Sequence, residues 1–332
     1  AEYMGSLALS VTFTMPTLLE KERDQLLASK QADPLGKNLS AASDKKRSGS
    51  AFMVQGLYDQ ALAEYKGALA LEVSELGSNN VRPAQTKINI GGILQSQGKY
   101  DEALVVYNEA LPVLNDSSGL NNKHLGVTYL NMGSCYLSLE NFEKALICYR
   151  HALAFKQAAF GDRHVEVANA KDGLALVHQN LQQYQEALAL YEDALSIKIH
   201  NYTEENVSVA GTYNNMAVIF DRLGRVDDAL RTFDRVIEIK SKCLGPMHLS
   251  VAATLKNLGN TQLSADRLED ALKSFDKAVK IEKTSFGDYH EAIAATLNKI
   301  STILNRMGRT QEAAAAYSAS VHVQQTVQTM HG

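Results

Sequence analysis

The stretch YQEALALYEDAL, residues 184–195, is one copy of a line of sequence that recurs along this chain. The other copies start at residues 58, 100, 142, 226, 268 and 310, so that each copy begins 42 residues after the one before it. Every copy has an alanine four residues before an aromatic ring, as Ala187 precedes Tyr191. Because residues i and i+4 share one face of a helix, the line predicts an amphipathic helix with a buried stripe of small and aromatic side chains. The alanines are Ala61, Ala103, Ala145, Ala187, Ala229, Ala271 and Ala313, and the rings are Tyr65, Tyr107, Tyr149, Tyr191, Phe233, Phe275 and Tyr317.

A second helical stretch, such as TYNNMAVIFDRLG at residues 212–224, precedes most copies of this line. It carries a recurring small residue, which is a glycine at Gly91, Gly133 and Gly259. A glycine inside a helix costs about 1 kcal/mol relative to alanine, so its recurrence predicts a tight contact with the other helix. The residue between the two helices marks the end of the first one, since it is most often a glycine that accepts the left-handed conformation. These residues are Gly56, Gly98, Glu140, Gln182, Gly224, Asp266 and Gly308.

The order N-x-G followed by G-x-Y-x-E-A-L-x-x-Y-x-x-A-L resembles the tetratricopeptide repeat (TPR), although 42 residues exceed the usual 34 of that family. The connectors FGDRHVEVA, LGPMHLSVA and FGDYHEAIA, at residues 160–168, 244–252 and 286–294, are similar to the link between kinesin light chain repeats. The resemblance implies an all-α, right-handed superhelical solenoid of about seven helix hairpins, with the first helix of each hairpin on the inner wall. It implies a cargo-binding module but no motor attachment, because residues 17–31 are too short for a coiled coil. The tryptophan of many TPR helices is absent.

The expected domain organisation is an N-terminal tail with a short helix, residues 1–38, followed by the solenoid, residues 39–330. The tail would hold a helix at residues 18–30 and a loop at residues 31–38. In the first repeat, Lys45, Lys46 and Arg47 take the place of apolar residues and predict a terminal helix exposed to water. Pro112 predicts an early end or a kink in its helix, because proline lacks the amide donor. The repeat units lie near residues 39–80, 81–122, 123–164, 165–206, 207–248, 249–290 and 291–330.

Composition excludes several classes of function. The formal charge of −4 leaves no basic surplus for binding nucleic acid. The most apolar stretch, residues 7–19, is too short to span a bilayer, so we expect a cytoplasmic protein without a membrane span, with the cytoskeleton as one place where it could act. Three cysteines without CxxC spacing indicate neither a disulfide framework nor a zinc site.

Catalytic and metal sites find no support in the sequence. The connector histidines His164, His248 and His290 belong to different repeats, and helix packing places successive repeats roughly 16 to 20 Å apart, too far for a shared ion. We expect these histidines to cap the next helix or to pack in the loop. The chain contains no GxGxxG, GxxxxGK[ST] or GxSxG motif. The prediction is a non-enzymatic protein without cofactors or metal ions.

The candidate site is the inner wall. Alignment of the first helices places an asparagine at one equivalent position in four repeats, and asparagine amides can pair with the peptide groups of an extended ligand. Basic residues gather in repeats five to seven, whereas Ile88, Leu130, Leu137 and Leu176 make the earlier repeats apolar. This polarity predicts a ligand with an apolar anchor and acidic residues. The candidate groove residues are Asn89, Asn131, Asn214, Asn215, Arg222, Lys256, Asn257, Asn260, Lys299 and Arg306, with Gly173 and Lys299 interrupting the asparagine row.

The same residues permit several interpretations. The asparagines could bond within their own hairpins and the basic residues could form a solvated face. The leading hypothesis is a peptide-binding adaptor that captures a cargo or partner protein. The alternative is a structural scaffold of a cytoskeletal or ciliary assembly that binds through its outer surface, with residues 7–19 in the groove. A weaker alternative is docking of a chaperone C-terminus by Lys256, Asn260 and Lys299.

Overall fold

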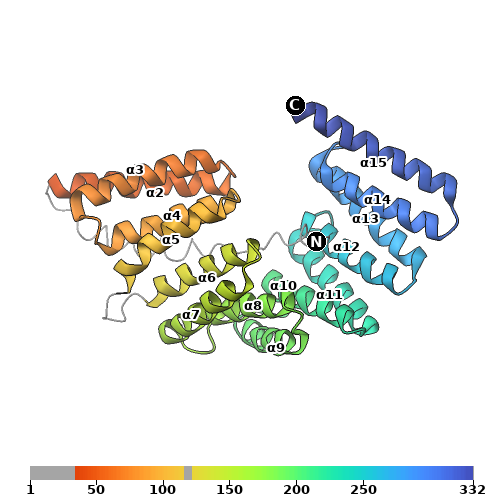
Figure 1. Cartoon of the computed structure of the whole chain (residues 1–332), viewed down its shortest axis with the longest axis horizontal. Coiled ribbons are helices and arrows are strands. Elements are labelled where there is room, and N and C mark those ends of the chain that lie inside the picture. Colours follow the sequence, from red (N-terminus) through yellow and green to blue (C-terminus); the bar gives the residue numbers. More distant parts are fainter. Residues whose placement is uncertain (1–33, 116–121, 332) are drawn as a thin grey trace. The chain divides into compact units, whose positions relative to one another are not determined.

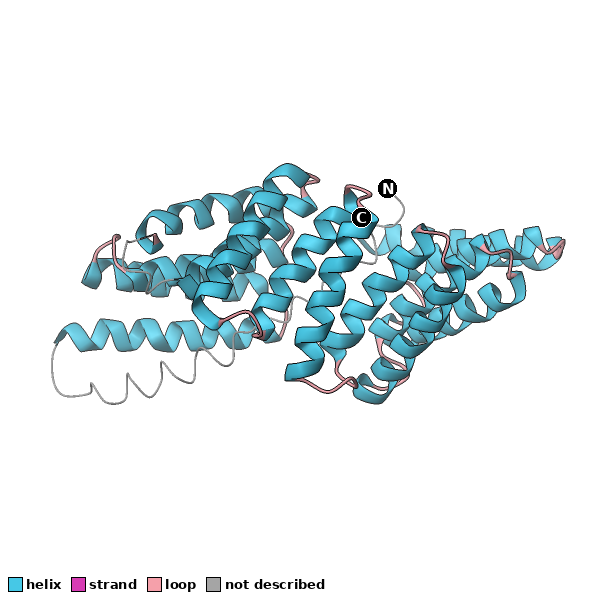
Figure 2. Ribbon diagram, turned by 90° about the horizontal axis from the view of Figure 1, so that it is seen from below, coloured by secondary structure: helices cyan, strands magenta, loops and turns pink. Residues whose placement is uncertain are grey.

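The computed structural model describes residues 34–115 and 122–331, and these residues form fourteen α-helices and no strand (Figures 1 and 2). The expectation of an all-α fold is therefore confirmed. The helices are α2 (Pro34–Val54), α3 (Tyr58–Leu76), α4 (Val81–Ser96), α5 (Tyr100–Leu114), α6 (Asn122–Ser138), α7 (Phe142–Phe160), α8 (Val165–Asn180), α9 (Tyr184–Asn201), α10 (Val207–Arg222), α11 (Val226–Leu244), α12 (Leu249–Ser264), α13 (Leu268–Phe286), α14 (Glu291–Arg306) and α15 (Thr310–His331). Among these described helices, none combines the length and the apolar composition that a membrane span requires.

The helices form two compact units. The N-terminal unit holds α2 to α8 and ends at Leu181, and the C-terminal unit begins at Gln182 and holds α9 to α15. Within the units, helices pack as hairpins: α2 on α3, α4 on α5 and α6 on α7, then α10 on α11, α12 on α13 and α14 on α15. We call the even-numbered members first helices and the odd-numbered members second helices.

The first helices lie on the inner side of each unit. In the N-terminal unit α4 contacts α6 and α6 contacts α8, and in the C-terminal unit α10 contacts α12. Within either unit, the second helices of neighbouring hairpins lie less closely against each other than these first helices do. Stacked hairpins curve toward the side on which their helices approach most closely, so an inner face built from first helices agrees with the expectation from sequence.

The core follows the predicted stripe. The seven alanines are at most 1% exposed, and the first six rings of the stripe are at most 3% exposed. Tyr317 of α15 is the exception at 58%, because among the described helices none follows α15 to cover it. The turn between the helices of each pair also follows the prediction. All seven boundary residues have a positive φ, including Glu140 at 56°, Gln182 at 60° and Asp266 at 60°.

The first hairpin differs from its prediction in two respects. The helix begins at Pro34 rather than at residue 39, since proline is well tolerated in the first turn, where its missing N–H is not needed. Lys45 and Lys46 pair with Glu64 and Glu72 of α3 at 3.2 and 2.9 Å and are partly exposed, whereas Arg47 is exposed as predicted.

At the other predicted boundaries the structure agrees more closely. The helix with Pro112 ends at Leu114 and is the shortest of the fourteen described helices, as the proline predicts. The last helix extends to His331, one residue beyond the expected end of the last repeat at residue 330. The expected helix at residues 18–30 and the apolar stretch at residues 7–19 lie outside the described residues.

Candidate functional site

The connectors place a capping side chain at the start of the first helices. His164, His248 and His290 accept hydrogen bonds through Nδ1 from the backbone N–H two residues later, at 3.2, 3.1 and 3.2 Å. Asn80 and Asn206 occupy the same position of the repeat and cap α4 and α10 in the same way. A side-chain acceptor at this position satisfies one of the amide donors that a helix start leaves without an intrahelical partner. The capping role predicted for the histidines is confirmed.

The asparagine row lies where a first helix meets the hairpin before it. In the N-terminal unit, Asn131 of α6 hydrogen-bonds the buried hydroxyl of Tyr107 on α5. Burial raises the pKa of Tyr107 well above its usual value, and the bond from Asn131 lowers it. Where glycine interrupts the row, at Gly173, the ring of Tyr149 fills the space. The other members, Asn89 and Asn215, are partly exposed.

In the C-terminal unit, the structure brings two candidate residues together. The Nδ2 of Asn257 on α12 donates to the Oδ1 of Asn214 on α10 at 3.4 Å. The same oxygen accepts from the hydroxyl of Thr254 at 3.5 Å. Both asparagines are partly exposed, so α10 and α12 share a polar surface that crosses from one hairpin to the next.

This polar surface continues inward to a lysine that sequence reasoning missed. Lys240 of α11 is only 9% exposed, and its ammonium donates to the Thr254 hydroxyl at 2.9 Å and to the Ser250 carbonyl at 3.3 Å. Both acceptors are neutral, and within the described residues no carboxylate pairs with Lys240. Burial lowers its pKa to about 8, because an ammonium loses hydration in the interior. The Lys240–Thr254–Asn214 chain therefore connects a buried positive charge to the inner face.

The sequence does mark the position of Lys240, because the same position recurs every 42 residues along the chain. An ionisable side chain recurs there near the end of the second helices, and each is buried. A threonine fourteen residues later bonds most of them, as Thr86 bonds Glu72 at 2.6 Å and Thr296 bonds Glu282 at 2.8 Å. The recurring residues are Glu72, Lys156, Lys198, Lys240 and Glu282.

The predicted basic cluster is less open to a ligand than its sequence suggests. Lys256 pairs with the carboxylate of Glu282 at 2.7 Å, and that carboxylate is 2% exposed. Arg306 bonds Asp266 at 2.7 Å and the Leu263 carbonyl at 3.1 Å. Arg222 is exposed, and Asn260 and Lys299 are partly exposed on α12 and α14. Since Lys256 already neutralises a buried carboxylate, the structure does not favour docking of a chaperone C-terminus at this site.

The earlier repeats expose little apolar surface that could bind the apolar anchor expected of the ligand. Ile88, Leu137 and Leu176 are 6%, 8% and 3% exposed and belong to the core. Leu130 is partly exposed. An apolar residue on a first helix here faces its own hairpin or the neighbouring one, because small residues bring the helices into close contact. The polar surface of the C-terminal unit is therefore the candidate site.

Comparison with solved structures gives the fold a context. The chain is similar to the crystal structure of BtubC (BKLC) from P. vanneervenii, with 21% identity, a TM-score of 0.54, and 78% of this chain and 94% of that chain covered. It is also similar to a putative kinesin light chain with nearly identical TPR-like repeats from Podosopora anserina, with 19% identity, a TM-score of 0.55, and 62% and 98% covered. Aspartyl phosphate phosphatase F from Bacillus subtilis aligns at 15% identity and a TM-score of 0.63 over 93% of this chain and 74% of that chain. At such identities the similarity shows the fold alone.

Among curated proteins, none matches this sequence. The family model described as tetratricopeptide repeat matches residues 40–116, 125–199, 208–283 and 263–325, which is most of the chain. The repeats it matches contain the buried alanine and ring stripe, the positive-φ turns and the capped connectors described above. The chain therefore belongs to the tetratricopeptide repeat family, whose members are protein and peptide interaction modules.

Proposed function

We propose that this protein is a non-enzymatic adaptor that binds an extended, acidic segment of a partner protein on the inner face of its C-terminal unit. The observation that supports the proposal most directly is the contact between Asn214 and Asn257 across two hairpins, with Thr254 and Lys240 behind it. Amide groups spaced along neighbouring first helices offer donors and acceptors to the peptide groups of an extended chain.

The charge of this surface supports an acidic ligand. Lys240 carries a positive charge at neutral pH, since its pKa of about 8 lies above 7, and its acceptors are neutral oxygens. A carboxylate placed on the Asn214 and Asn257 amides would lie near this charge and stabilise it. Arg222 and Lys299 extend the basic character to α10 and α14.

A randomised library of short peptides tests the proposal. The wild-type protein should select peptides rich in Asp and Glu, and the double variant Asn215→Ala, Asn257→Ala should bind the selected peptides more weakly by about 1 to 3 kcal/mol. Asn108→Ala is the matched control, because Asn108 is exposed on the second helix α5. Selection without enrichment in acids, or equal loss in the control, would contradict the proposal.

The alternative function is a structural scaffold that binds through its second helices. It predicts that the Asn215→Ala, Asn257→Ala variant retains every partner interaction, whereas charge changes on exposed second-helix residues such as Lys273 and Lys280 disrupt them. A pull-down with both sets of variants, analysed by mass spectrometry, separates a scaffold of a cytoskeletal or ciliary assembly from an inner-face adaptor.

A further inference from the structure

A second polar cluster lies between α10 and α11, on another side of α10 from the candidate residues Asn215 and Arg222. Tyr213 and Phe220 are seven residues apart and therefore share one face of α10, whereas Asn215 and Arg222 follow each of them by two residues, or about 200° around the helix. The two rings line a small open cavity of about 230 Å³. Its other lining residues are Arg225, Asp228, Arg231, Thr232 and Arg235.

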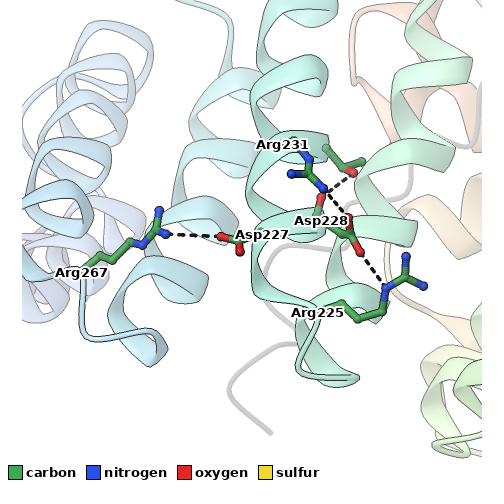
Figure 3. Close-up of polar contacts among 6 residues, drawn as sticks. Arg225, Asp227, Asp228, Arg231 and Arg267 are labelled. Carbon is green, nitrogen blue, oxygen red and sulfur yellow. Dashed lines mark hydrogen bonds and ion pairs between the residues drawn. The ribbon is translucent and has the colours of Figure 1, made fainter.

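Three guanidinium groups line this cavity, two of them against its rings and two of them bonded to its aspartate. Arg225 lies over the ring of Phe220, 4.4 Å from its centroid, and Arg235 lies over Tyr213 at 5.8 Å. Asp228 accepts from Arg225 Nε at 2.8 Å and from Arg231 Nη2 at 2.7 Å. Figure 3 shows both arginines directed at Asp228, while Arg267 pairs with Asp227 away from them.

Most N–H donors of these arginines have no acceptor within the described residues. A guanidinium has five N–H donors. For each of Arg225, Arg231 and Arg235, one of them has an acceptor in the described part of the protein: Asp228 for the first two and Glu204 for the third. Rings lie over the guanidinium groups of Arg225 and Arg235, and the three arginine side chains remain 50%, 45% and, for Arg231, 74% exposed, so their other N–H groups are accessible to a ligand. The cavity therefore presents an excess of donors to any group with several acceptor oxygens.

The repeat architecture does not require this cluster. In the preceding repeat, the three arginine positions hold Gln183, Ala189 and Asp193. In the following repeat they are basic, with Arg267, Lys273 and Lys277, but the ring positions hold Leu255 and Gln262, which supply no aromatic support. The hairpin of α10 and α11 is the one described hairpin that combines three arginines with two rings, so the combination is not a consequence of the fold.

We infer that this cavity binds a phosphorylated side chain of a partner protein. The ion pair of Arg235 with Glu204 is solvent-exposed, with 45% and 54% of the two side chains accessible, so an entering anion can replace Glu204 at little cost. Among the residues that line the cavity, three guanidiniums and the single carboxylate of Asp228 then leave a net charge of two positive units. That charge matches a phosphate monoester, which carries about −1.5 to −2 and three acceptor oxygens. Bidentate arginine pairs suit its geometry.

The test uses a short phosphoserine peptide flanked by alanines and labelled with a fluorophore, with the Ser and Glu peptides of the same sequence as comparisons. Fluorescence anisotropy at fixed ionic strength measures the affinity of the full chain. The phosphoserine peptide should bind most tightly, and Arg231→Gln should weaken it about tenfold. Arg231 is 74% exposed in its side chain, so this variant retains the fold. Glu204→Gln should bind the phosphoserine peptide more tightly than the wild type.

Lys273→Gln is the matched control. Lys273 occupies the position of Arg231 in the next repeat, is 72% exposed, and pairs with an aspartate three residues before it, as Arg231 does. Its substitution changes the net charge equally and should leave the affinity unchanged. Equal affinity for the Glu and phosphoserine peptides, or equal loss in both variants, overturns the inference. The Asn215→Ala, Asn257→Ala variant should bind the phosphoserine peptide normally, which separates this cavity from the inner-face proposal.

Discussion

Gly173 of α8 lies directly against the ring of Tyr149 of α7, so closely that a Cβ on the glycine would be 2.2 Å from the tyrosine Cε1. The opposite side of the ring is occupied by Gly133, where a Cβ would be 3.0 Å away. The tyrosine is 3% exposed. Two glycines on two first helices therefore enclose one ring, which joins α8 to the hairpin of α6 and α7 within the N-terminal unit and accounts for the missing asparagine at residue 173.

The first prediction concerns Gly173→Ala. The added methyl must displace a ring that has no free space, so the variant should lose about 1 to 3 kcal/mol of stability even though alanine is the better helix former. Gly211→Ala is the control, because a Cβ there meets nothing within 4 Å and α10 gains helix propensity. Thermal unfolding followed by circular dichroism should show a lower Tm for the first variant and an equal or higher Tm for the second. An unchanged Tm for Gly173→Ala would refute this packing.

A second prediction concerns the ion pair between the partly exposed Lys256 and the buried Glu282. Glu282 is 2% exposed and is held by Lys256 at 2.7 Å and by Thr296 at 2.8 Å. Lys256→Met leaves that carboxylate without its cation, so we expect a loss of about 3 to 5 kcal/mol. The double variant Lys256→Met, Glu282→Gln removes both charges and should recover much of the loss. Chemical denaturation measures both. If the double variant is no more stable than the single one, the pair does not act as a unit.

Lys256 shows which features could be predicted from the sequence and which could not. Period and residue type were sufficient to predict the helices, the alanine and ring stripe, the positive-φ turns and the capping histidines, because each depends on local geometry that repeats every 42 residues. The partner of a long polar side chain depends on which neighbouring helix it reaches. Lys256 therefore looked like a ligand-binding cation, although it pairs with Glu282 twenty-six residues later. Lys240 was overlooked because its burial depends on the packing of α11 against α12.

A third prediction separates binding from stability at the inner face. Asn257→Ala removes the amide that bonds Asn214 at 3.4 Å, a long bond between partly exposed groups. Such a bond contributes little to folding, so we expect a change in unfolding free energy below about 1 kcal/mol and a larger loss of affinity for an acidic peptide. Calorimetric titration and thermal unfolding of the same samples provide the comparison. A large fall in Tm with intact affinity would assign Asn257 to the hairpin contact alone.

The last prediction concerns the pH dependence that Lys240 imposes. Its pKa falls from 10.5 to about 8 on folding because of burial, so between these values the unfolded chain binds more protons than the folded chain. The free energy of unfolding therefore rises with the pH between about 8 and about 10.5, as Lys240 loses its proton. Below about 8, burial of the ammonium lowers the free energy of unfolding by its full amount, about 2 to 4 kcal/mol. Lys240→Met should stabilise the protein at pH 7 and remove this part of the pH dependence, while it weakens binding of acidic peptides. Lys280→Met, at an exposed position of α13, is the control and should change neither. Denaturation of the three proteins at pH 7 and pH 10 measures the difference. If Lys240→Met is less stable than the wild type at pH 7, the hydrogen bonds of the ammonium outweigh its loss of hydration and the prediction is wrong.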